Sequence, residues 1–438
     1  MLPFPKWPIL ILVLLFHFYN ANAQQSIFEL MDRTDLVLPE VEQLAMAYIK
    51  KNGTGQGSGF KQYQRWLYER KFHVDGQGRF IRPEVEQEIY QKFISQNSFN
   101  KKASIQWTEL GPTTPSYVGV VGPGVGRITS IAISPKDTSV IYVSSPGGGI
   151  WKSTDAGATW KPLMDNLNYA WMDVYNISLD PTSSGVLYAA LTKGGVIKST
   201  NGGTSWAATG TGPDYSRKVM VHPTNSKIVF ATAQNGLWRS TNSGVSWTNV
   251  QNTDFEDLEF NPANPNIMYA SRSDFTLLSC VWRSSDNGVN WTNIGLGNGI
   301  TTSGRTLLGV SPANPAVLYV LQSKGDLFGV LYRSNDSGKT YKVQVKASSS
   351  TNYFGNATDG SGTTGQAWYD MAICVNPKDV DEVHIGGMIA FKSTNGGVSF
   401  TAESGYWYPN SIGYIHPDLH AFEYVNQTLF VGTDGGIF

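Results

Sequence analysis

The sequence is short of three features that would place it in other protein classes. It holds only two cysteines, Cys280 and Cys374, in different and non-neighbouring units of the repeat described below, so we expect buried free thiols and no metal-binding cysteine motif. Charged residues make up only 15% and the formal net charge is −1, which excludes a basic surface for nucleic acid. After residue 23, no apolar run is long enough to cross a membrane.

Aromatic residues and glycine are what the sequence has instead. Aromatics reach 12%, and there are 46 glycines. This combination favours short strands joined by tight turns, whereas helical proteins usually carry more alanine, leucine, glutamate and lysine. The composition therefore predicts a chain rich in β-structure.

The first residues have the pattern of an export signal. Lys6 supplies a positive charge, residues 9–16 are strongly apolar, and Ala21-Asn22-Ala23 offers a small-residue cleavage site. The apolar run is too short for a membrane anchor, which needs about 20 residues. We therefore expect residues 1–23 to be removed and the mature protein to be secreted, either extracellular or at the cell surface.

Residues 24–103 are predicted to form a short helical leader. Apolar residues between Val41 and Ile49 recur at helical spacing after Pro39, and further helices are expected over 60–70 and 82–95. No residue in this leader suggests chemistry.

A ten-residue template recurs six times from residue 151 onward. It reads aromatic or aliphatic, basic, Ser, any, Asp or Asn, any, Gly, two further residues, and an aromatic. The six serines lie 41 to 59 residues apart, a spacing typical of a four-stranded propeller blade. The six segments are 151–160, 197–206, 238–247, 282–291, 332–341 and 391–400.

The residue types of the template predict a structural turn. The Asp or Asn accepts hydrogen bonds from nearby backbone N–H groups, the glycine permits a positive φ, and the closing aromatic packs between neighbouring blades. Asn replaces Asp in three segments, at Asn201, Asn242 and Asn395, which a catalytic carboxylate would not tolerate. We expect this corner to join the third and fourth strands of each blade.

These repeats predict an all-β, multi-bladed β-propeller over residues 104–438, preceded by the helical leader. Seven blades are visible, and the last is incomplete because Phe438 takes the position that Trp151 has in the first blade. We therefore expect the sequence to be part of a longer protein. Residues 105–110 resemble a fourth strand with no corner before it, so we expect them to form the outermost strand of the blade that closes the ring.

The corners, together with Gly-Gly-Ile-Trp at 148–151 and Gly-Gly-Ile-Phe at 435–438, resemble the Asp-box (BNR) repeats of sortilin-like and xyloglucanase-like propellers. The chain is most similar to large secreted propeller proteins of Bacteroidetes bacteria over residues 60–438. That likeness is carried by Gly-Arg-Ile at 126–128, Gln-Ala-Trp-Tyr-Asp at 366–370, His-Pro-Asp-Leu-His at 416–420 and Thr-Asp-Gly-Gly at 433–436. The resemblance implies a fold and leaves the activity open.

Relatives of the xyloglucanase-like type include inverting hydrolases whose catalytic acid lies in a Thr-Asp-x-Gly-Gly motif before the third strand of a blade. In the first blade Pro146 stands at that position, which weakens the hydrolase interpretation, whereas Asp434 matches in the last blade. Asp370 and Asp418 come from blades six and seven, so each is a possible partner for Asp434. Glycosidic cleavage needs two carboxyl groups roughly 5 to 9.5 Å apart.

Function in propellers usually lies where the innermost strands meet the central channel. The starts of these strands carry charge, and alternating signs would either hold one another in a solvated ring or form a polar ligand site at the channel mouth. The charged positions are Arg127, Asp173, Arg217, Asp257, Arg305, Asp370 and Asp418 or His420.

His416, Asp418 and His420 alternate along a strand and so share one face, which suits metal or proton chemistry. A hydrogen-bonded His–Asp pair that orders the turn is the alternative. No further ligand is visible, so we assign neither a metal nor a cofactor. Aromatics nearby would stack on sugar rings or peptide side chains, and the Ser/Thr/Gly/Asn-rich stretch 342–367 is a candidate binding loop. These aromatics are Trp368, Tyr369, Tyr406, Trp407 and Tyr408.

Two functions follow. The first is a secreted, monomeric propeller that binds an extracellular protein or polysaccharide through Arg127, Trp368, Tyr369, His416 and His420. The second is a glycoside hydrolase that uses Asp434 with Asp370 or Asp418 as acid and base. The fold alone does not choose between them.

Overall fold

The computed structural model describes residues 27–31, 33, 35–55, 58–96, 126–165, 167, 173–273, 281–295, 297–302, 304–407 and 412–438. The chain divides into two compact units, Met1–Glu86 and Gln87–Phe438. The predicted signal segment 1–23, the predicted closing strand 105–110, Cys280 and Tyr408 lie outside the described residues. Cys374 is half-buried on the first strand of the sixth blade.

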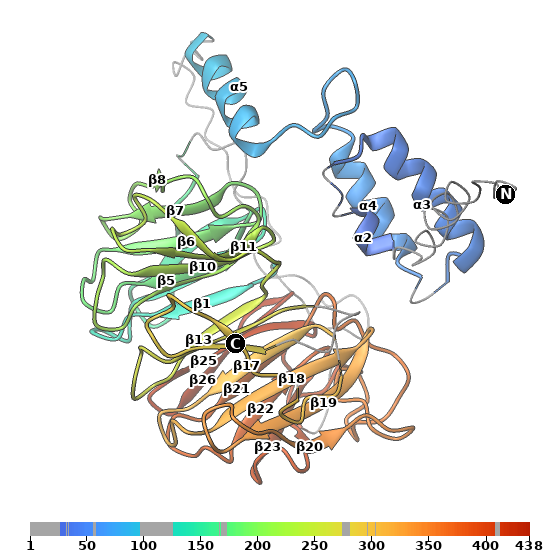
Figure 1. The fold of residues 1–438 in the computed structure, drawn as a ribbon, viewed down its shortest axis with the longest axis vertical. Coiled ribbons are helices and arrows are strands. Elements are labelled where there is room, and N and C mark those ends of the chain that lie inside the picture. Colours follow the sequence, from blue (N-terminus) through green and yellow to red (C-terminus); the bar gives the residue numbers. More distant parts are fainter. Residues whose placement is uncertain are drawn as a thin grey trace, which may run out of the picture. The chain divides into compact units, whose positions relative to one another are not determined.

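The first unit is helical (Figure 1). It contains α2 (Ile27–Met31), α3 (Leu38–Asn52) and α4 (Phe60–Arg70), while α5 (Pro83–Gln96) lies across the boundary between the units. The three helices pack around Ile27, Val41 and Tyr63, all nearly inaccessible to solvent. Helices therefore form where the apolar spacing predicts them. Among the described residues, no helix has the length and apolar content that spanning a membrane would require.

The second unit consists of seven small antiparallel sheets whose strands follow chain order. Blade 1 contains β1 (Ser130–Ile133), β2 (Ile141–Ser145), β3 (Gly149–Ser153) and β4 (Lys161–Pro162). Blade 2 contains β5 (Val174–Leu179), β6 (Leu187–Leu191), β7 (Gly195–Ser199) and β8 (Ala207–Ala208). Blade 3 contains β9 (Ser216–Val221), β10 (Val229–Ala233), β11 (Gly236–Ser240) and β12 (Thr248–Gln251).

The remaining blades repeat this plan. Blade 4 contains β13 (Asp257–Phe260), β14 (Met268–Ser271), β15 (Val281–Ser284) and β16 (Thr292–Asn293). Blade 5 contains β17 (Thr306–Val310), β18 (Leu318–Lys324), β19 (Leu327–Ser334) and β20 (Lys342–Lys346). Blade 6 contains β21 (Ala372–Val375), β22 (Val383–Gly386), β23 (Ala390–Ser393) and β24 (Thr401–Ala402), and blade 7 contains β25 (Leu419–Val425), β26 (Thr428–Thr433) and β27 (Gly436–Ile437).

The seven sheets close into a ring because each packs against the next. Seven hydrophobic clusters lie in the seven seams between neighbouring blades. The last seam joins blade 7 to blade 1: Phe430 and Ile437 pack against Ile131, and the Ile128 N–H donates to the Thr433 carbonyl at 2.9 Å. The predicted multi-bladed β-propeller is therefore confirmed, and its ring has seven blades.

The six repeated corners are built by one hydrogen-bond pattern. In each, the glycine N–H donates to the serine Oγ at 2.8 to 2.9 Å. The N–H two residues later donates to Oδ1 of the Asp or Asn at 2.8 to 3.0 Å. Because Asp and Asn both offer that oxygen, either residue serves, and the corner glycines all have positive φ. These acidic residues are structural, as the sequence predicts.

The basic residue of the template also has a packing role. On the second strand of several blades an aromatic side chain is fully buried in the seam, and the basic residue paired with it lies over its ring. The cation lies 5.1 to 5.9 Å from the ring centroid in the pairs Lys152–Tyr142, Lys198–Tyr188, Arg239–Phe230 and Arg333–Tyr319. The template thus specifies both the corner and the basic side chain that covers the buried aromatic ring in the seam.

Candidate functional site

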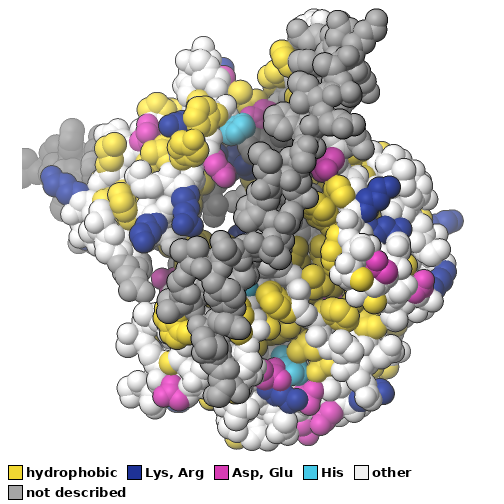
Figure 2. Space-filling view, turned by 180° about the vertical axis from the view of Figure 1, so that it is seen from behind, with side chains coloured by type: hydrophobic (Ala, Val, Ile, Leu, Met, Phe, Trp, Pro, Cys, Tyr) yellow, Lys and Arg dark blue, Asp and Glu magenta, His cyan; other side chains and the backbone are white. Residues whose placement is uncertain are grey.

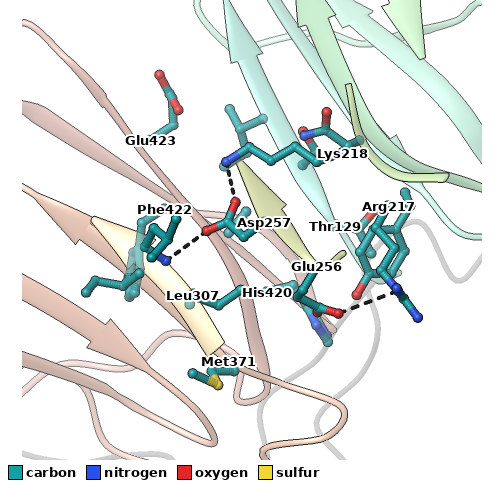
Figure 3. A pocket seen from close by; sticks show the side chains of 18 of the residues that line it. Thr129, Arg217, Lys218, Glu256, Asp257, Leu307, Met371, His420, Phe422 and Glu423 are labelled. Atoms are coloured by element: carbon teal, nitrogen blue, oxygen red, sulfur yellow. Dashed lines mark hydrogen bonds and ion pairs between the residues drawn. The ribbon is translucent and has the colours of Figure 1, made fainter. Parts of the chain in front are cut away.

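The first strands of the blades surround the central channel. Neighbouring first strands contact one another around the ring, from β1 and β5 through to β25 and back to β1. A cavity of about 220 Å³ lies between them and is lined by residues of all seven first strands (Figure 3). Most of the sequence-predicted charges at the starts of these strands fall into three groups and one carboxyl pair, whereas Asp173 stands apart.

One group is an ion-pair network on the channel wall. Arg305 Nε lies 2.9 Å from Glu256 Oε1, and Arg305 Nη1 donates to the Ala367 carbonyl at 3.0 Å. Arg217 pairs with Asp254 and lies 3.5 Å from the other oxygen of Glu256. Burial alone would raise the pKa of Glu256, but the two guanidinium groups lower it below its usual value. The predicted arginines thus pair with Asp254 and Glu256, two carboxylates that sequence reasoning did not identify.

A second group lies on the same wall. Lys218 Nζ contacts Asp257 Oδ1 and Glu259 Oε1, both at 2.6 Å. Asp257 also accepts hydrogen bonds from the backbone N–H groups of Leu258 and Leu308, which fills both of its oxygens. Glu423 of blade 7 lines the same cavity. Of these residues, sequence reasoning identified only Asp257.

The third group gathers around Asp434 at the end of blade 7. The Tyr369 hydroxyl donates to both Asp434 oxygens, at 2.9 and 2.8 Å, and His420 Nε2 lies 2.8 Å from Oδ1. Arg127 covers the Tyr369 ring at 5.1 Å, so blades 1, 6 and 7 all contribute. We name Arg127, Tyr369, His420 and Asp434 the Asp434 cluster.

The cluster holds Asp434 as a carboxylate beside a neutral imidazole. Burial would raise the pKa of Asp434, but hydrogen bonds from His420 and Tyr369 and the Arg127 charge lower it overall. Burial lowers the pKa of His420 despite the nearby carboxylate. Since a carboxylate only accepts hydrogen bonds, the neutral ring carries its proton on Nε2.

Asp370 and Asp418 form a carboxyl pair near the cluster. Asp370 is fully buried and accepts a hydrogen bond from Gln366 Nε2 at 3.2 Å. Burial and the Asp418 charge raise the pKa of Asp370 well above its usual value. Burial and the Asp434 charge raise the pKa of Asp418 to about 6, although a hydrogen bond with Asp370 opposes this. Two neighbouring carboxyl groups with raised pKa values retain protons at a pH where isolated carboxyls have lost them.

The other predicted ligand-binding residues lie around these groups. The ring of Trp368 lies 5.4 Å from that of Tyr369, and the Trp407 ring packs edge-on against Tyr406 at 4.4 Å. His416 packs against Gly435, and its Nδ1 lies 3.1 Å from the Pro417 carbonyl oxygen. His416 and His420 therefore have separate partners. The described ranges contain no group of three or more His, Cys, Asp or Glu that would hold a metal ion.

Two further predictions concern Asp173 and the stretch 342–367. Asp173 accepts a hydrogen bond from Thr192 at 2.7 Å within blade 2, so it stands apart from the three groups. In the stretch 342–367, Phe354 is fully buried, and Asn352 binds the backbone of both Phe328 and Thr364. The middle of this stretch is thus packed into the seam between blades 5 and 6.

On the face drawn in Figure 2, the described residues show no comparable concentration of charge. Figure 2 shows Lys, Arg, Asp and Glu side chains interspersed over the visible face, which agrees with the net charge of −1. The three groups in and around the channel are therefore the main candidates for function.

Solved structures with the same architecture include glycoside hydrolases and a peptide-binding protein. A GH74 enzyme from Niastella koreensis has a TM-score of 0.53 and 20% identity, over 73% of this chain and 53% of its own. The GH74 xyloglucanase from Xanthomonas campestris has a TM-score of 0.51 and 17% identity, over 73% and 52%. YCF48 bound to D1 peptide has a TM-score of 0.50 and 15% identity, over 74% and 97%.

The chain spans about half the length of these GH74 structures. No protein-family model matches it, and no curated protein sequence matches it either. Likeness at this level of identity concerns the fold, and the chain is a seven-bladed β-propeller with helices near its N-terminus.

Proposed function

We propose that this chain is an exported Asp-box propeller of the xyloglucanase-like type that binds a glycan at the channel mouth between blades 6, 7 and 1. The observation that carries the proposal is the Asp434 cluster. It joins an ionised carboxylate, a neutral imidazole, a phenol and a guanidinium from three blades at one place. Convergent polar groups from separate elements are typical of ligand sites.

The chemistry of the cluster supports a ligand rich in hydroxyl groups. A carboxylate accepts hydrogen bonds from sugar hydroxyls, and Arg127 donates to ring or hydroxyl oxygens. Trp368 lies beside Tyr369, and Trp407 is 47% exposed, so both offer aromatic surface on which a sugar face stacks. The GH74 neighbours act on glycans, which agrees with this ligand class, while YCF48 with its bound peptide keeps protein ligands as the alternative.

Calorimetric titration against oligosaccharides and peptides tests the proposal. We expect a neutral oligosaccharide to bind and Asp434→Asn to weaken binding at least tenfold, because the variant loses a charge-assisted acceptor. Asp155→Asn is the matched control: it makes the same change in a corner, where Asn performs the same role in three other blades. Binding of peptides alone, or full glycan affinity in Asp434→Asn, would overturn the proposal.

Glycoside hydrolysis is the second candidate, and one observation favours it. The Asp370–Asp418 pair holds a proton near neutral pH while Asp434 stays ionised. Carboxyl groups whose pKa values are pushed apart are what acid–base cleavage of a glycosidic bond requires. In this mechanism the pair protonates the leaving oxygen, and Asp434 activates water or attacks the sugar.

Release of reducing ends from a polysaccharide panel separates the two functions. If the chain is a hydrolase, Asp434→Asn and Asp418→Asn each abolish release while Asp155→Asn retains it. If the chain only binds glycans, the wild-type protein releases no reducing ends from the polysaccharide that it binds most tightly.

A further inference from the structure

The channel cavity contains a second charge cluster, separate from the Asp434 cluster. Lys218 is shared by Asp257 and Glu259, and Asp257 also accepts hydrogen bonds from two backbone N–H groups. Glu423 reaches the same space from blade 7. Arg217, Arg305 and Glu256 line the same cavity and pair with one another. With all groups ionised, the lining carries three cations and four carboxylates, which leaves an excess of one negative charge.

Glu423 is the member whose charge is least compensated. No hydrogen bond or ion pair joins its carboxyl to another residue drawn in Figure 3, although Glu423 lines the cavity. Its charged neighbours are Lys218 and Glu259 from blades 3 and 4, and the titratable thiol of Cys374 lies near it in blade 6.

A proton on Glu423 offsets this excess charge. Burial and the charge of Glu259 raise the pKa of Glu423 to about 7, against the opposing effect of Lys218. Burial also raises the pKa of Glu259. The cavity thus takes up a proton near neutral pH, which is how a protein relieves an excess of buried negative charge when a cation is absent.

The size and walls of the cavity indicate which kind of cation fits. Its volume is about 220 Å³. At about 30 Å³ per water, that is far more space than a bare ion needs. Apolar residues, among them Leu307, Met371 and Phe422, also line it. A charged head with an apolar stem matches both surfaces, because such groups bury their methylenes and direct their charge toward polar partners.

We propose that the channel cavity binds a primary alkylammonium group, with Glu423 and Glu259 facing the ammonium and the apolar wall contacting the alkyl stem. A lysine side chain of a polypeptide and a free diamine share this chemistry. The carboxyl groups of this site are not members of the Asp434 cluster, although His420 of that cluster lines the same cavity, and amine binding does not depend on glycan binding.

Calorimetric titration with three probes of similar length tests the proposal and separates the two sources. The probes are 1,5-diaminopentane, Nα-acetyl-lysine N-methylamide and the uncharged 1,5-pentanediol. Binding of the lysine analogue supports a polypeptide source, and binding of the diamine alone supports a free amine. If neither amine binds, or if the diol binds as tightly, the proposal is wrong.

The pH dependence of wild-type binding is an independent measurement. Both amines stay protonated between pH 6 and 8, whereas Glu423 must ionise to bind them, so amine affinity should rise about tenfold over this range. For the same reason, each amine bound at pH 7 should release a fraction of a proton on average. Repeating the titration in buffers with different ionisation heats measures that release. An affinity that is flat with pH would contradict the assignment of Glu423.

Glu423→Gln should weaken amine binding at least tenfold and remove the pH dependence. Because the wild-type group is largely protonated at pH 6, the variant should fold with a similar thermal midpoint there. Glu88→Gln, an exposed site on α5, is the matched control and should bind as wild type. Asp434→Asn should also retain amine affinity, so failure of the glycan proposal and failure of this one are distinguishable. Unchanged amine binding in Glu423→Gln would overturn the inference.

Discussion

The hydroxyl of Tyr369, just before blade 6, donates to both carboxylate oxygens of Asp434 in blade 7, at 2.9 and 2.8 Å. The bond crosses from one blade to the next and fixes the acid beside His420. The position of Asp434 therefore depends on the packing of blade 6 against blade 7.

Removing that hydroxyl should change the charge state and binding of Asp434. In Tyr369→Phe the carboxylate loses a hydrogen bond that favours its ionised form, so the pKa of Asp434 should rise, as measured by carboxyl carbon NMR titration. Glycan affinity should fall about tenfold, because Asp434 loses the hydrogen bond that holds it in position, and a hydrogen bond to a charged group is typically worth at least that much. Tyr68→Phe, at an exposed site on α4, should change neither quantity. An unmoved Asp434 pKa in Tyr369→Phe would contradict the geometry.

The Asp370–Asp418 pair should make the fold less stable as pH rises. Both pKa values are raised in the folded state, so the protonated forms stabilise it below the unfolded pKa. Each contribution is lost as pH rises through the folded pKa, which is about 6 for Asp418. Thermal unfolding between pH 5 and 8 should show the decline, and Asp418→Asn should make it shallower. Asp359→Asn, an exposed control, should reproduce the wild-type slope.

Alanine substitutions at two glycines with similar φ distinguish the free-energy cost of a steric clash from that of backbone strain. Gly288 (φ +72°) would place a Cβ 2.2 Å from Phe230 Cε1, whereas Gly297 (φ +80°) has no atom within 4 Å. Gly297→Ala should cost about 1 kcal/mol from strain alone, and Gly288→Ala about 1 to 3 kcal/mol more from overpacking. Urea unfolding measures both free energies. Equal losses would mean that the corner relaxes away from Phe230.

The Arg217–Glu256–Arg305 network should be important for stability. Glu256→Gln removes the charge between two guanidinium groups on the channel wall, where the side chains of Glu256 and Arg305 are only 9 and 10% exposed. Breaking a buried ion pair typically costs about 3 kcal/mol, since the remaining charge is uncompensated. Chemical denaturation checks this value, with Glu88→Gln as the exposed control. A loss within 0.5 kcal/mol of zero (about the size of surface substitutions) would show that water replaces the carboxylate.

The blades could be predicted from sequence because their signal is local. Each corner lies within ten residues, and the hydrogen bonds to its serine and its Asp or Asn join residues at most four apart. The residues of the Asp434 cluster could be named as candidates for a related reason, because they lie in short motifs on consecutive blades. The distances between these residues could not be predicted, because they depend on how the blades pack.

The channel charges were harder to predict. Lys218, Glu256, Glu259 and Glu423 lie on or next to first strands, where polar and apolar residues alternate irregularly, and their partners come from other blades. The segment Glu256-Asp257-Leu258-Glu259 was the available signal, because a strand with three acidic residues in four usually faces solvent or a channel. Which of its carboxyls face Lys218 and Glu423 follows only from the closed ring.

The hydrogen bond between Ile128 and Thr433 has a consequence for the order of folding. Within a blade, each strand pairs with its sequence neighbour, so blades assemble through short chain closures. The seam between blades 7 and 1 instead unites residues roughly 300 positions apart, for which the entropic cost of closure is greatest. Joining of these two blades is thus expected to come last, and until then both of their facing surfaces remain open to association with other chains.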